Sequence, residues 1–219
     1  MRLTIYGKSV VTKALVFTVA IDIIALLVPV FIMKLILLAV SVLLFGFVLY
    51  FFRDPVRILP EGLKDNEIIS PADGKVMMIE EIEENTFLKS KAKLVGIFLS
   101  PLNVHVNRVP VSGMVAYYQY IKGEYIVAFN HKSSDRNERT EIGITNPKFK
   151  ILFKQIAGFV ARRIVCSLRA GAAVKRGEKF GMIKFGSRVD VIMPVNAVVK
   201  VSVNQRVKGG ETILAEVPA

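Results

Sequence analysis

The chain has 219 residues, enough for one ordinary domain with an appendage. Its net charge of +12 suggests an anionic partner, but nucleic acid is disfavoured because the sequence has no zinc-ligand pattern, no basic helix with heptads and no RNA-binding aromatic signature. A hydrophobic content of 53% and a mean hydropathy of +0.47 are high for a purely soluble domain. The single cysteine, Cys166, excludes an internal disulfide, and its neighbours Ile164 and Val165 predict a buried thiol rather than a nucleophile.

Residues 14–52 form an apolar run in which Asp22 and Lys34 are the only charges. Lys34 divides the run into segments of about 20 and about 18 residues, each near the length that crosses a bilayer as a helix. Pro29 and Lys34 lie near the middle, where a helical hairpin would turn. We therefore predict a membrane-associated helical hairpin over residues 1–54.

The flanks of this run indicate its orientation. Basic residues on both sides favour two cytoplasmic ends, and so a cell-membrane protein whose remaining chain is on the cytoplasmic side; these residues are Arg2, Lys8, Lys13, Arg53 and Arg57. A cleaved signal peptide fits poorly, because the run is too long and no small-residue cleavage site follows it. A buried helix pair in a soluble core is less favoured, since so long a run with two charges is rare in such cores.

The composition changes after Phe52, and Pro55 and Pro60 indicate a short extended linker. Beyond the linker, short β-branched segments separated by glycines predict a β-rich domain over residues 55–219, so the chain as a whole is of the α+β class. Residues 157–165 fit a modest helix or, equally, a strand. The clearest strand segments are 74–76, 94–99, 113–115, 143–145 and the alternating 198–203.

Several conventional functional sites are excluded. The chain has two histidines, His105 and His131, so a multi-histidine metal site cannot form and we expect no bound metal. It has neither a glycine-rich phosphate loop nor a G-x-S-x-G elbow. Residues 71–76 and 207–211 resemble the glycine turns of carrier-type β-sandwiches such as lipoyl domains. A membrane-tethered carrier or adaptor without catalysis is therefore one alternative function.

The pair Gly186 and Ser187 has chemistry suited to peptide self-cleavage, although the same pair is also common in plain turns. Glycine leaves its carbonyl sterically open, and the hydroxyl of the next residue can attack that carbonyl to give an ester. Loss of the serine Cα proton then eliminates the ester. The dehydroalanine that remains hydrolyses to a pyruvoyl group, a product that serine gives directly.

Further blocks precede this pair in a fixed order: FFRDP at 51–55, SPADGKV at 70–76, SPLNVHVNRVP at 100–110, NER at 137–139, QIAGFVARRIVC at 155–166 and then FGSRVD at 185–190. Together they resemble the short, proenzyme-type phosphatidylserine decarboxylases, a group in which we include archaetidylserine decarboxylase-like proteins. Each block is moderately specific alone, whereas the ordered set, ending at Gly-Ser, is strong. The resemblance covers most of the chain from residue 51 to residue 194.

The resemblance implies roles for individual residues. Ser187 would become the pyruvoyl group after cleavage between 186 and 187, and Gly186 would end the larger fragment. Asp73 would support self-cleavage, although an Asp-Gly turn is an equally supported interpretation. His105 would deliver a proton during decarboxylation, the alternative being a strand-end histidine held by a backbone carbonyl.

One position departs from the longer bacterial relatives, which carry a second histidine three residues after the first and use it in self-cleavage. Here that position is Arg108, and arginine does not act as a base near neutral pH. The cleavage relay therefore differs in this chain, or His131 replaces the missing histidine. The substrate-binding residues that we expect are Arg108, His131, Asn137 and Arg139.

The reaction that the resemblance implies is decarboxylation of phosphatidylserine to phosphatidylethanolamine, through a Schiff base with the pyruvoyl group and without pyridoxal phosphate. The implied partners are a phosphatidylserine-type lipid, the membrane, and the chain's own large and small fragments, which would form a heterodimer. A pyruvoyl decarboxylase of a soluble amino acid is a second alternative, against which the hairpin argues.

Overall fold

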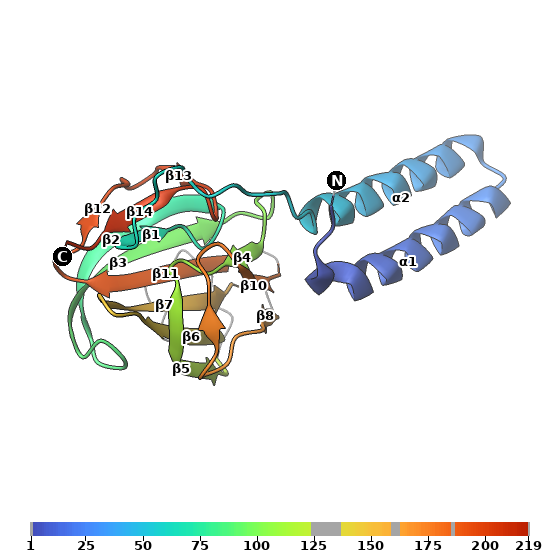
Figure 1. Ribbon diagram of the computed structural model, residues 1–219. Coiled ribbons are helices and arrows are strands. Elements are labelled where there is room, and N and C mark those ends of the chain that lie inside the picture. Colours follow the sequence, from blue (N-terminus) through green and yellow to red (C-terminus); the bar gives the residue numbers. More distant parts are fainter. Residues whose placement is uncertain (1, 124–136, 159–162, 185–186, 219) are drawn as a thin grey trace. The chain divides into compact units, whose positions relative to one another are not determined.

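The computed structural model describes residues 2–123, 137–158, 163–184 and 187–218. The chain divides into two compact units, Met1–Pro55 and Val56–Ala219. The first unit consists of helices and the second of strands, which confirms the predicted α+β class (Figure 1).

The helical unit contains a short 3₁₀ helix, η1 (Ile5–Gly7), and two long helices, α1 (Lys8–Leu27) and α2 (Phe31–Phe51). The long helices have 20 and 21 residues, so at 1.5 Å per residue each is about 30 Å long, the thickness of a bilayer's hydrocarbon core. Both are apolar enough to cross a membrane, and only 6% of the most apolar part of each is buried. Pro29 lies in the turn between them, whereas Lys34 lies in the first turn of α2.

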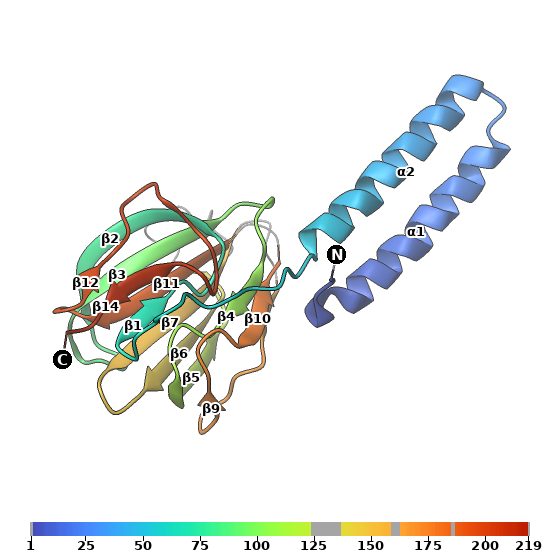
Figure 2. The same ribbon diagram turned by 45° about the horizontal axis from the view of Figure 1, so that its top comes forward.

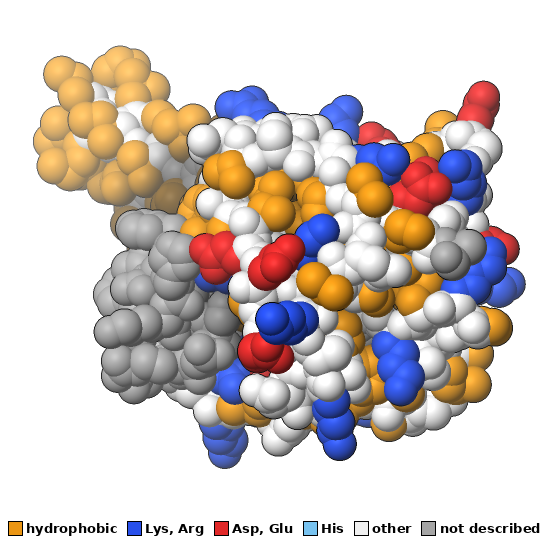
Figure 3. Space-filling model, turned by 90° about the vertical axis from the view of Figure 1, so that its left-hand side faces the viewer, with side chains coloured by type: hydrophobic (Ala, Val, Ile, Leu, Met, Phe, Trp, Pro, Cys, Tyr) orange, Lys and Arg blue, Asp and Glu red, His pale blue; other side chains and the backbone are white. Residues whose placement is uncertain are grey.

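The two helices form a hairpin whose ends lie together. The Thr4 amide donates a hydrogen bond to the Phe52 carbonyl over 2.9 Å, and Leu3 forms an isolated antiparallel bridge with Arg53. Gly7 packs so closely on Phe52 that a Cβ atom at Gly7 would lie 2.2 Å from the ring. The chain therefore enters and leaves the hairpin at the same end, and the surface of the hairpin is mostly hydrophobic (Figure 3).

The strands of the second unit form three sheets among the described residues, and neighbouring strands in them are antiparallel. The large sheet has the order β13-β2-β3-β11-β7-β6-β5-β9, and two small sheets have the orders β1-β14-β12 and β4-β10-β8. The strands are β1 (Glu67–Ile69), β2 (Gly74–Glu84), β3 (Ser90–Leu99), β4 (Val106–Arg108), β5 (Gly113–Ile121), β6 (Arg139–Thr145), β7 (Lys150–Ala157), β8 (Ile164–Cys166), β9 (Ala173–Val174), β10 (Lys179–Ile183), β11 (Ser187–Pro194), β12 (Val198–Val199), β13 (Arg206–Val207) and β14 (Ile213–Glu216).

The main hydrophobic core lies between the inner face of the large sheet and the two small sheets (Figure 2). Phe153 of β7 and Phe180 of β10 meet edge to face with ring centroids 5.4 Å apart. Ile68 of β1, Leu214 of β14 and Val191 of β11 belong to the same buried cluster. Packing between these apolar side chains thus holds the curled large sheet against the two small sheets.

Strand β11 is buried on its other face as well, because the hairpin between β2 and β3 folds over it. Ile192 of β11 packs in a second cluster with Phe87 of the hairpin, and Phe87 stacks on Tyr117 with ring centroids 6.0 Å apart. The Glu84 carboxylate accepts the amides of residues 86–88 at the hairpin tip. Burial opposes the charge on Glu84, but these amides hold its pKa below the ordinary value. These bonds fix the conformation of the hairpin tip.

Residues 157–165 are extended wherever the structure describes them. Ala157 ends β7, Ile164–Cys166 forms β8, and residues 159–162 lie outside the described residues. Strand β8 pairs with β10, which favours the strand interpretation of its β-branched residues over the helix. Burial raises the pKa of the Cys166 thiol to about 11, so this thiol is protonated at neutral pH, as a structural cysteine is.

The alternating residues 198–203, predicted as one strand, pair only at Val198–Val199. The residues that follow form a turn, in which Asn204 has a φ of +74° and the Gln205 amide donates to the Ser202 carbonyl over 3.1 Å. Val201 is buried in the main core. Val198 and Val203 are 49% and 48% exposed, so the apolar alternation in this segment marks neither one continuous strand nor one buried face.

Deleting residues 2–52 should release the β-rich unit from the membrane, because its main core is formed by its own residues. The measurement is an immunoblot of carbonate-washed membranes and of the supernatant, with the full chain as the control that stays in the pellet. A truncated chain that remained in the washed pellet would contradict an anchoring role for α1 and α2.

Candidate active site

Ser187 is the first residue of β11, which runs through the middle of the large sheet (Figure 1). It pairs with Leu99 of β3 on one side and with Ala157 of β7 on the other. Its side chain is fully buried, and its Oγ has no hydrogen-bond partner among the described residues. Leaving a buried hydroxyl without a partner costs about 1–3 kcal/mol, so this group calls for a functional explanation.

The surroundings of Ser187 are apolar, and they come from the large sheet and from the small sheet β4-β10-β8. The cluster at this end of the molecule consists of Ala72, Leu99, Ala157, Ile183 and Val189. Ile183 ends β10 of a small sheet, and four residues later Ser187 begins β11 of the large sheet. The peptide bond before Ser187 therefore belongs to the connection between the two sheets. Gly186, the other residue of the predicted cleavage pair, lies outside the described residues.

His105 is fully buried in the segment between β3 and β4. Its Nδ1 atom is 2.9 Å from the Asn103 carbonyl oxygen. Because a carbonyl oxygen only accepts hydrogen bonds, Nδ1 carries the proton and Nε2 is the basic nitrogen of the neutral ring. The next residue, Val106, pairs with Met182 of β10. The backbone at His105 therefore lies beside the end of the strand that leads into Ser187.

Asp73 comes just before β2, and both of its carboxylate oxygens are engaged. Oδ2 pairs with Arg57 Nη2 at 2.6 Å, and Oδ1 accepts the Gly209 amide at 2.8 Å. Burial raises the pKa of Asp73 above its ordinary value, although the Gly209 amide and Arg57 oppose that shift. Gly74 at the start of β2 and Ser187 lie on either side of β3, so two strand spacings, about 10 Å, separate their backbones. The carboxylate fixes the end of β2 and makes no hydrogen bond to the Ser187 hydroxyl.

Asn137 supports the strand next to Ser187. Its side chain is fully buried, and its Nδ2 donates a hydrogen bond to the Ala157 carbonyl over 2.7 Å. Because Ala157 is the β7 residue that pairs with Ser187, this bond fixes the backbone on that side of the site. His131 lies outside the described residues.

Arg139 belongs to a charged cluster on the face of the large sheet opposite Ser187. Its Nε pairs with Glu141 at 2.9 Å, and Lys154 pairs with the same carboxylate at 3.1 Å. Arg139 of β6 and Arg188 of β11 both pair with Ile156 of β7, one from each side. Since successive residues of a strand point to opposite faces, Arg139 shares the face of Arg188 and not that of Ser187. The structure therefore does not bring Arg139 to the serine.

The residue after Ser187 anchors β11 from that opposite face. Arg188 Nε lies 2.5 Å from Asp190 Oδ1, and Arg188 Nη2 lies 3.0 Å from Asp190 Oδ2. The two side chains are 2% and 0% exposed. A Cβ atom at Gly96 would lie 3.3 Å from both Arg188 Nε and Asp190 Oδ1, so a glycine on β3 makes room for the pair. This bidentate ion pair holds the start of β11, and with it Ser187, in place.

Arg108 lines a separate basic pocket. Its Nη1 donates to the Gly177 carbonyl over 3.0 Å, and the pocket is also lined by Arg57. Neither Ser187 nor His105 is among the described residues that line this pocket. Arg108 therefore lies among other cationic side chains in this pocket and not beside Ser187.

A series of buried side-chain hydrogen bonds, which the sequence did not predict, connects the small sheet β4-β10-β8 to the large sheet. Thr140 Oγ1 of β6 donates to Gln155 Oε1 of β7 over 2.8 Å, and Gln155 Nε2 donates to Asn107 Oδ1 of β4 over 2.8 Å. Gln155 and Asn107 are fully buried. The sequence signal is a polar residue, Gln155, on the face of β7 that otherwise carries the apolar Ile151, Phe153 and Ala157. This chain fixes β4, the strand that directly follows His105.

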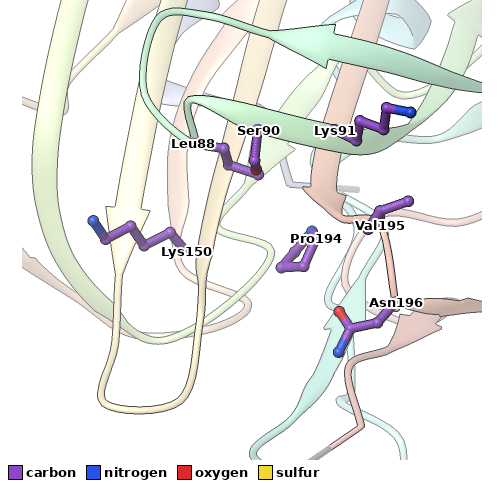
Figure 4. Close-up of a pocket in the computed structure, with 7 residues that line it drawn as sticks. All are labelled: Leu88, Ser90, Lys91, Lys150, Pro194, Val195 and Asn196. Carbon is purple, nitrogen blue, oxygen red and sulfur yellow. The ribbon is translucent and has the colours of Figure 1, made fainter.

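One of the larger cavities lies at the far end of β11 and is not the candidate site. It has a volume of about 400 Å³ and is lined by Pro194, the last residue of β11, together with Lys91 and Lys150. The two lysines extend to opposite sides of Pro194 (Figure 4). No candidate catalytic residue lines this cavity. In the part of the chain that the structure describes, no group of three or more His, Cys, Asp or Glu side chains is placed to hold a metal ion.

A buried serine at the start of a central strand, with a buried histidine beside the chain that leads to it, defines an enzyme-type site on a β-rich domain. The family model for phosphatidylserine decarboxylase matches residues 44–215. The chain belongs to the phosphatidylserine decarboxylase family, and its enzyme class is therefore that of the carboxy-lyases.

Two relatives illustrate the match. A protein of Chlorobium luteolum named phosphatidylserine decarboxylase proenzyme is 45% identical over 213 residues, which cover 97% of this chain and 99% of the relative. A protein of Cytophaga hutchinsonii with the same name is 49% identical over 180 residues, which cover 82% of this chain and 81% of the relative. Similarity of this extent includes the β-rich unit and, for the first relative, nearly the whole helical unit.

Replacing Gln155 by leucine should destabilise the protein, because Thr140 and Asn107 would each lose a buried hydrogen-bond partner. At about 1–3 kcal/mol for each of the two groups, and about 2–4 °C for each kcal/mol, the unfolding temperature should fall by about 4–24 °C. Circular dichroism on heating measures this change. Gln119→Leu, the same change at an exposed position, is the control and should shift the temperature little. Equal shifts for the two variants would contradict a structural role for the polar chain.

Proposed function

We propose that this protein decarboxylates phosphatidylserine to phosphatidylethanolamine at the cytoplasmic face of the cell membrane, with a pyruvoyl group that it makes from its own Ser187. The observation that carries the proposal is the Ser187 hydroxyl, which is buried without a hydrogen-bond partner in the described residues at the junction of two sheets. Membership of the family supports the reaction.

Self-cleavage would proceed in three steps. Ser187 Oγ attacks the Gly186 carbonyl carbon, the peptide C–N bond breaks, and an ester and a free amine form. A base then removes the Ser187 Cα proton, and elimination releases Gly186 as a carboxylate. The dehydroalanine left behind takes up water and releases ammonia, which yields the pyruvoyl group. The apolar surroundings of Ser187 favour the attack by excluding competing water.

The two fragments would stay together after cleavage, as a heterodimer of residues 1–186 and 187–219. The small fragment supplies β11 at the centre of the large sheet, and it also supplies β14 between β1 and β12. Separation would require breaking the pairing of β11 with β3 and β7 and the pairing of β14 with β1, and it would expose the core residues that β11 buries. The fold therefore tolerates a cut at this position.

The roles of the neighbouring residues follow from their positions. His105 Nε2 is the nitrogen that would exchange a proton with the substrate carbon, while the Asn103 carbonyl orients the ring through Nδ1. Asp73 would act on cleavage through the geometry of the β2 end that it fixes with Arg57 and Gly209. Asn137 would hold the backbone beside Ser187.

A pyruvoyl group at position 187 would supply the carbonyl that condenses with the substrate amine and withdraws electrons as carbon dioxide leaves. Helices α1 and α2 would hold the domain at the bilayer where the substrate lies. Because both ends of the hairpin lie together and both flanks are basic, one cytoplasmic side for the whole remaining chain is the simplest topology.

Replacing Ser187 by alanine should leave a single inactive chain, because no hydroxyl remains to attack the Gly186 carbonyl. Intact-mass analysis of the purified protein should show two fragments for the natural sequence and one uncut chain for the variant. Ser90→Ala, at an exposed serine of β3, is the control and should be cut normally. Active natural protein that contained only the uncut chain would end the self-cleavage proposal.

Replacing His105 by alanine should permit cleavage but reduce decarboxylation by about 10²–10⁴-fold, the usual loss for a missing general acid. Asp73→Asn should slow fragment formation instead, since it weakens the clamp with Arg57. A gel and a lipid assay on the same preparations measure both effects, and Asp65→Asn, at a largely exposed carboxylate, is the control. If His105→Ala blocked cleavage while Asp73→Asn was cut normally, this division of roles would be wrong, although the role of Ser187 would stand.

A further inference from the structure

The pocket that Arg108 lines is rich in basic side chains. It has a volume of about 330 Å³, at the lower end of the range for small-molecule sites. Its lining includes the cations Arg57, Arg108, Lys175 and Arg176, against the carboxylate of Glu178. A concave site with this balance of charge suits an anion.

The guanidinium group of Arg57 is fixed before any ligand arrives. It pairs with Asp73 at 2.6 Å and with Glu211 at 3.2 Å, and its side chain is 11% exposed. These two carboxylates offset the charge of Arg57. The excess positive charge of the pocket therefore depends on Arg108, Lys175 and Arg176.

Two of those three residues are also held by the protein. Arg108 donates to the Gly177 carbonyl, and Arg176 Nη1 donates to the carbonyls of Lys64 and Glu67 over 2.6 and 2.8 Å. Burial lowers the pKa of Arg176, while nearby acidic groups oppose that shift, so an anion beside its guanidinium would stabilise the charged form. Arg57, Arg108 and Arg176 are thus preorganised, which reduces the entropy cost of binding a phosphate.

Two glycine turns allow the cations to lie close to the backbone. Gly177 and Gly210 have φ values of +85° and +84°, which side chains rarely adopt. A Cβ atom at Gly210 would lie 2.9 Å from Arg108 Cδ, and one at Gly177 would lie 2.9 Å from Leu59 Cδ2. Larger residues at either turn would press on the residues that line the pocket.

An exposed apolar segment borders the pocket. Val56, Ile58 and Leu59 are 68%, 78% and 41% exposed, and between them Arg57 lines the pocket. Exposed apolar side chains beside a basic site are typical of surfaces that contact anionic membranes. In the sequence, Arg57 follows the end of α2 at Phe51 by six residues.

We propose that this pocket binds the phosphate of an anionic phospholipid headgroup, as an accessory site that neither Ser187 nor His105 lines, while Val56, Ile58 and Leu59 contact the adjoining acyl chains. The proposal rests on the membrane attachment proposed above. The occupied pocket orients the β-rich unit on the bilayer and keeps the reacting site near its lipid substrate.

The test measures binding and not activity. The full chain in an uncharged detergent is titrated calorimetrically with dihexanoyl phosphatidylglycerol, and in a parallel arm with inorganic phosphate. The natural sequence should bind the lipid saturably. Lys175→Gln combined with Arg176→Gln should weaken binding on the order of 10-fold or more, because two charge-assisted contacts are lost. The matched control, Lys91→Gln with Lys150→Gln, removes the same charge at the cavity of Figure 4 and should bind normally.

Two further variants separate lipid binding from protein stability and from self-cleavage. Lys175→Gln alone changes an exposed side chain, so it tests the pocket even if the double variant is unstable. Ser187→Ala should bind the lipid as the natural sequence does, which separates this proposal from self-cleavage. Equal lipid binding by the pocket variant and the control would overturn the proposal. Inorganic phosphate that bound at the pocket as tightly as the lipid would also overturn it, since the site would then take a free anion.

Discussion

The antiparallel pairing of β11 with β3 and β7 is the constraint on which the rest of the structure depends. It places Ser187 between Leu99 and Ala157, and it buries every residue from Ser187 to Met193. A strand with neighbours on both sides and cover on both faces has one stable position. Ser187 is therefore fixed by the sheet itself and not by a loop.

Burial on both faces has a consequence for the charged residues of β11. Arg188 and Asp190 point away from the main core, yet the β2–β3 hairpin covers them, so neither side chain reaches water freely. Their bidentate pair offsets each charge with the other through Nε and Nη2 of Arg188, while Arg188 Nη1 has no hydrogen-bond partner among the described residues. The same arrangement fixes the residue that follows the proposed cut, and a broken chain can therefore keep its register at this point.

The candidate site combines groups from two sheets. Ser187 belongs to the large sheet, whereas His105 comes directly before β4 of a small sheet. The hydrogen-bonded chain from Thr140 through Gln155 to Asn107 joins these layers inside the core. Polar bonds of this kind are directional, so they define the relative position of the sheets more narrowly than apolar packing does. This link holds His105 and Ser187 in a fixed relative position, although they belong to different sheets.

The sequence by itself determined the apolar helical run, the glycine-separated strands and the ordered blocks around Gly186 and Ser187, because each of these depends on residues that are neighbours in the chain. It did not determine that residues 164–166 pair as a strand, that pairing in the region of 198–203 stops at Val199, or that Arg139 lies on the face opposite Ser187. It also gave no sign that Gln155 connects Thr140 to Asn107, 48 residues away. These features were decided by the tertiary structure, because strand register sets both the partner and the face of every residue, and register follows from pairing between segments far apart in the sequence.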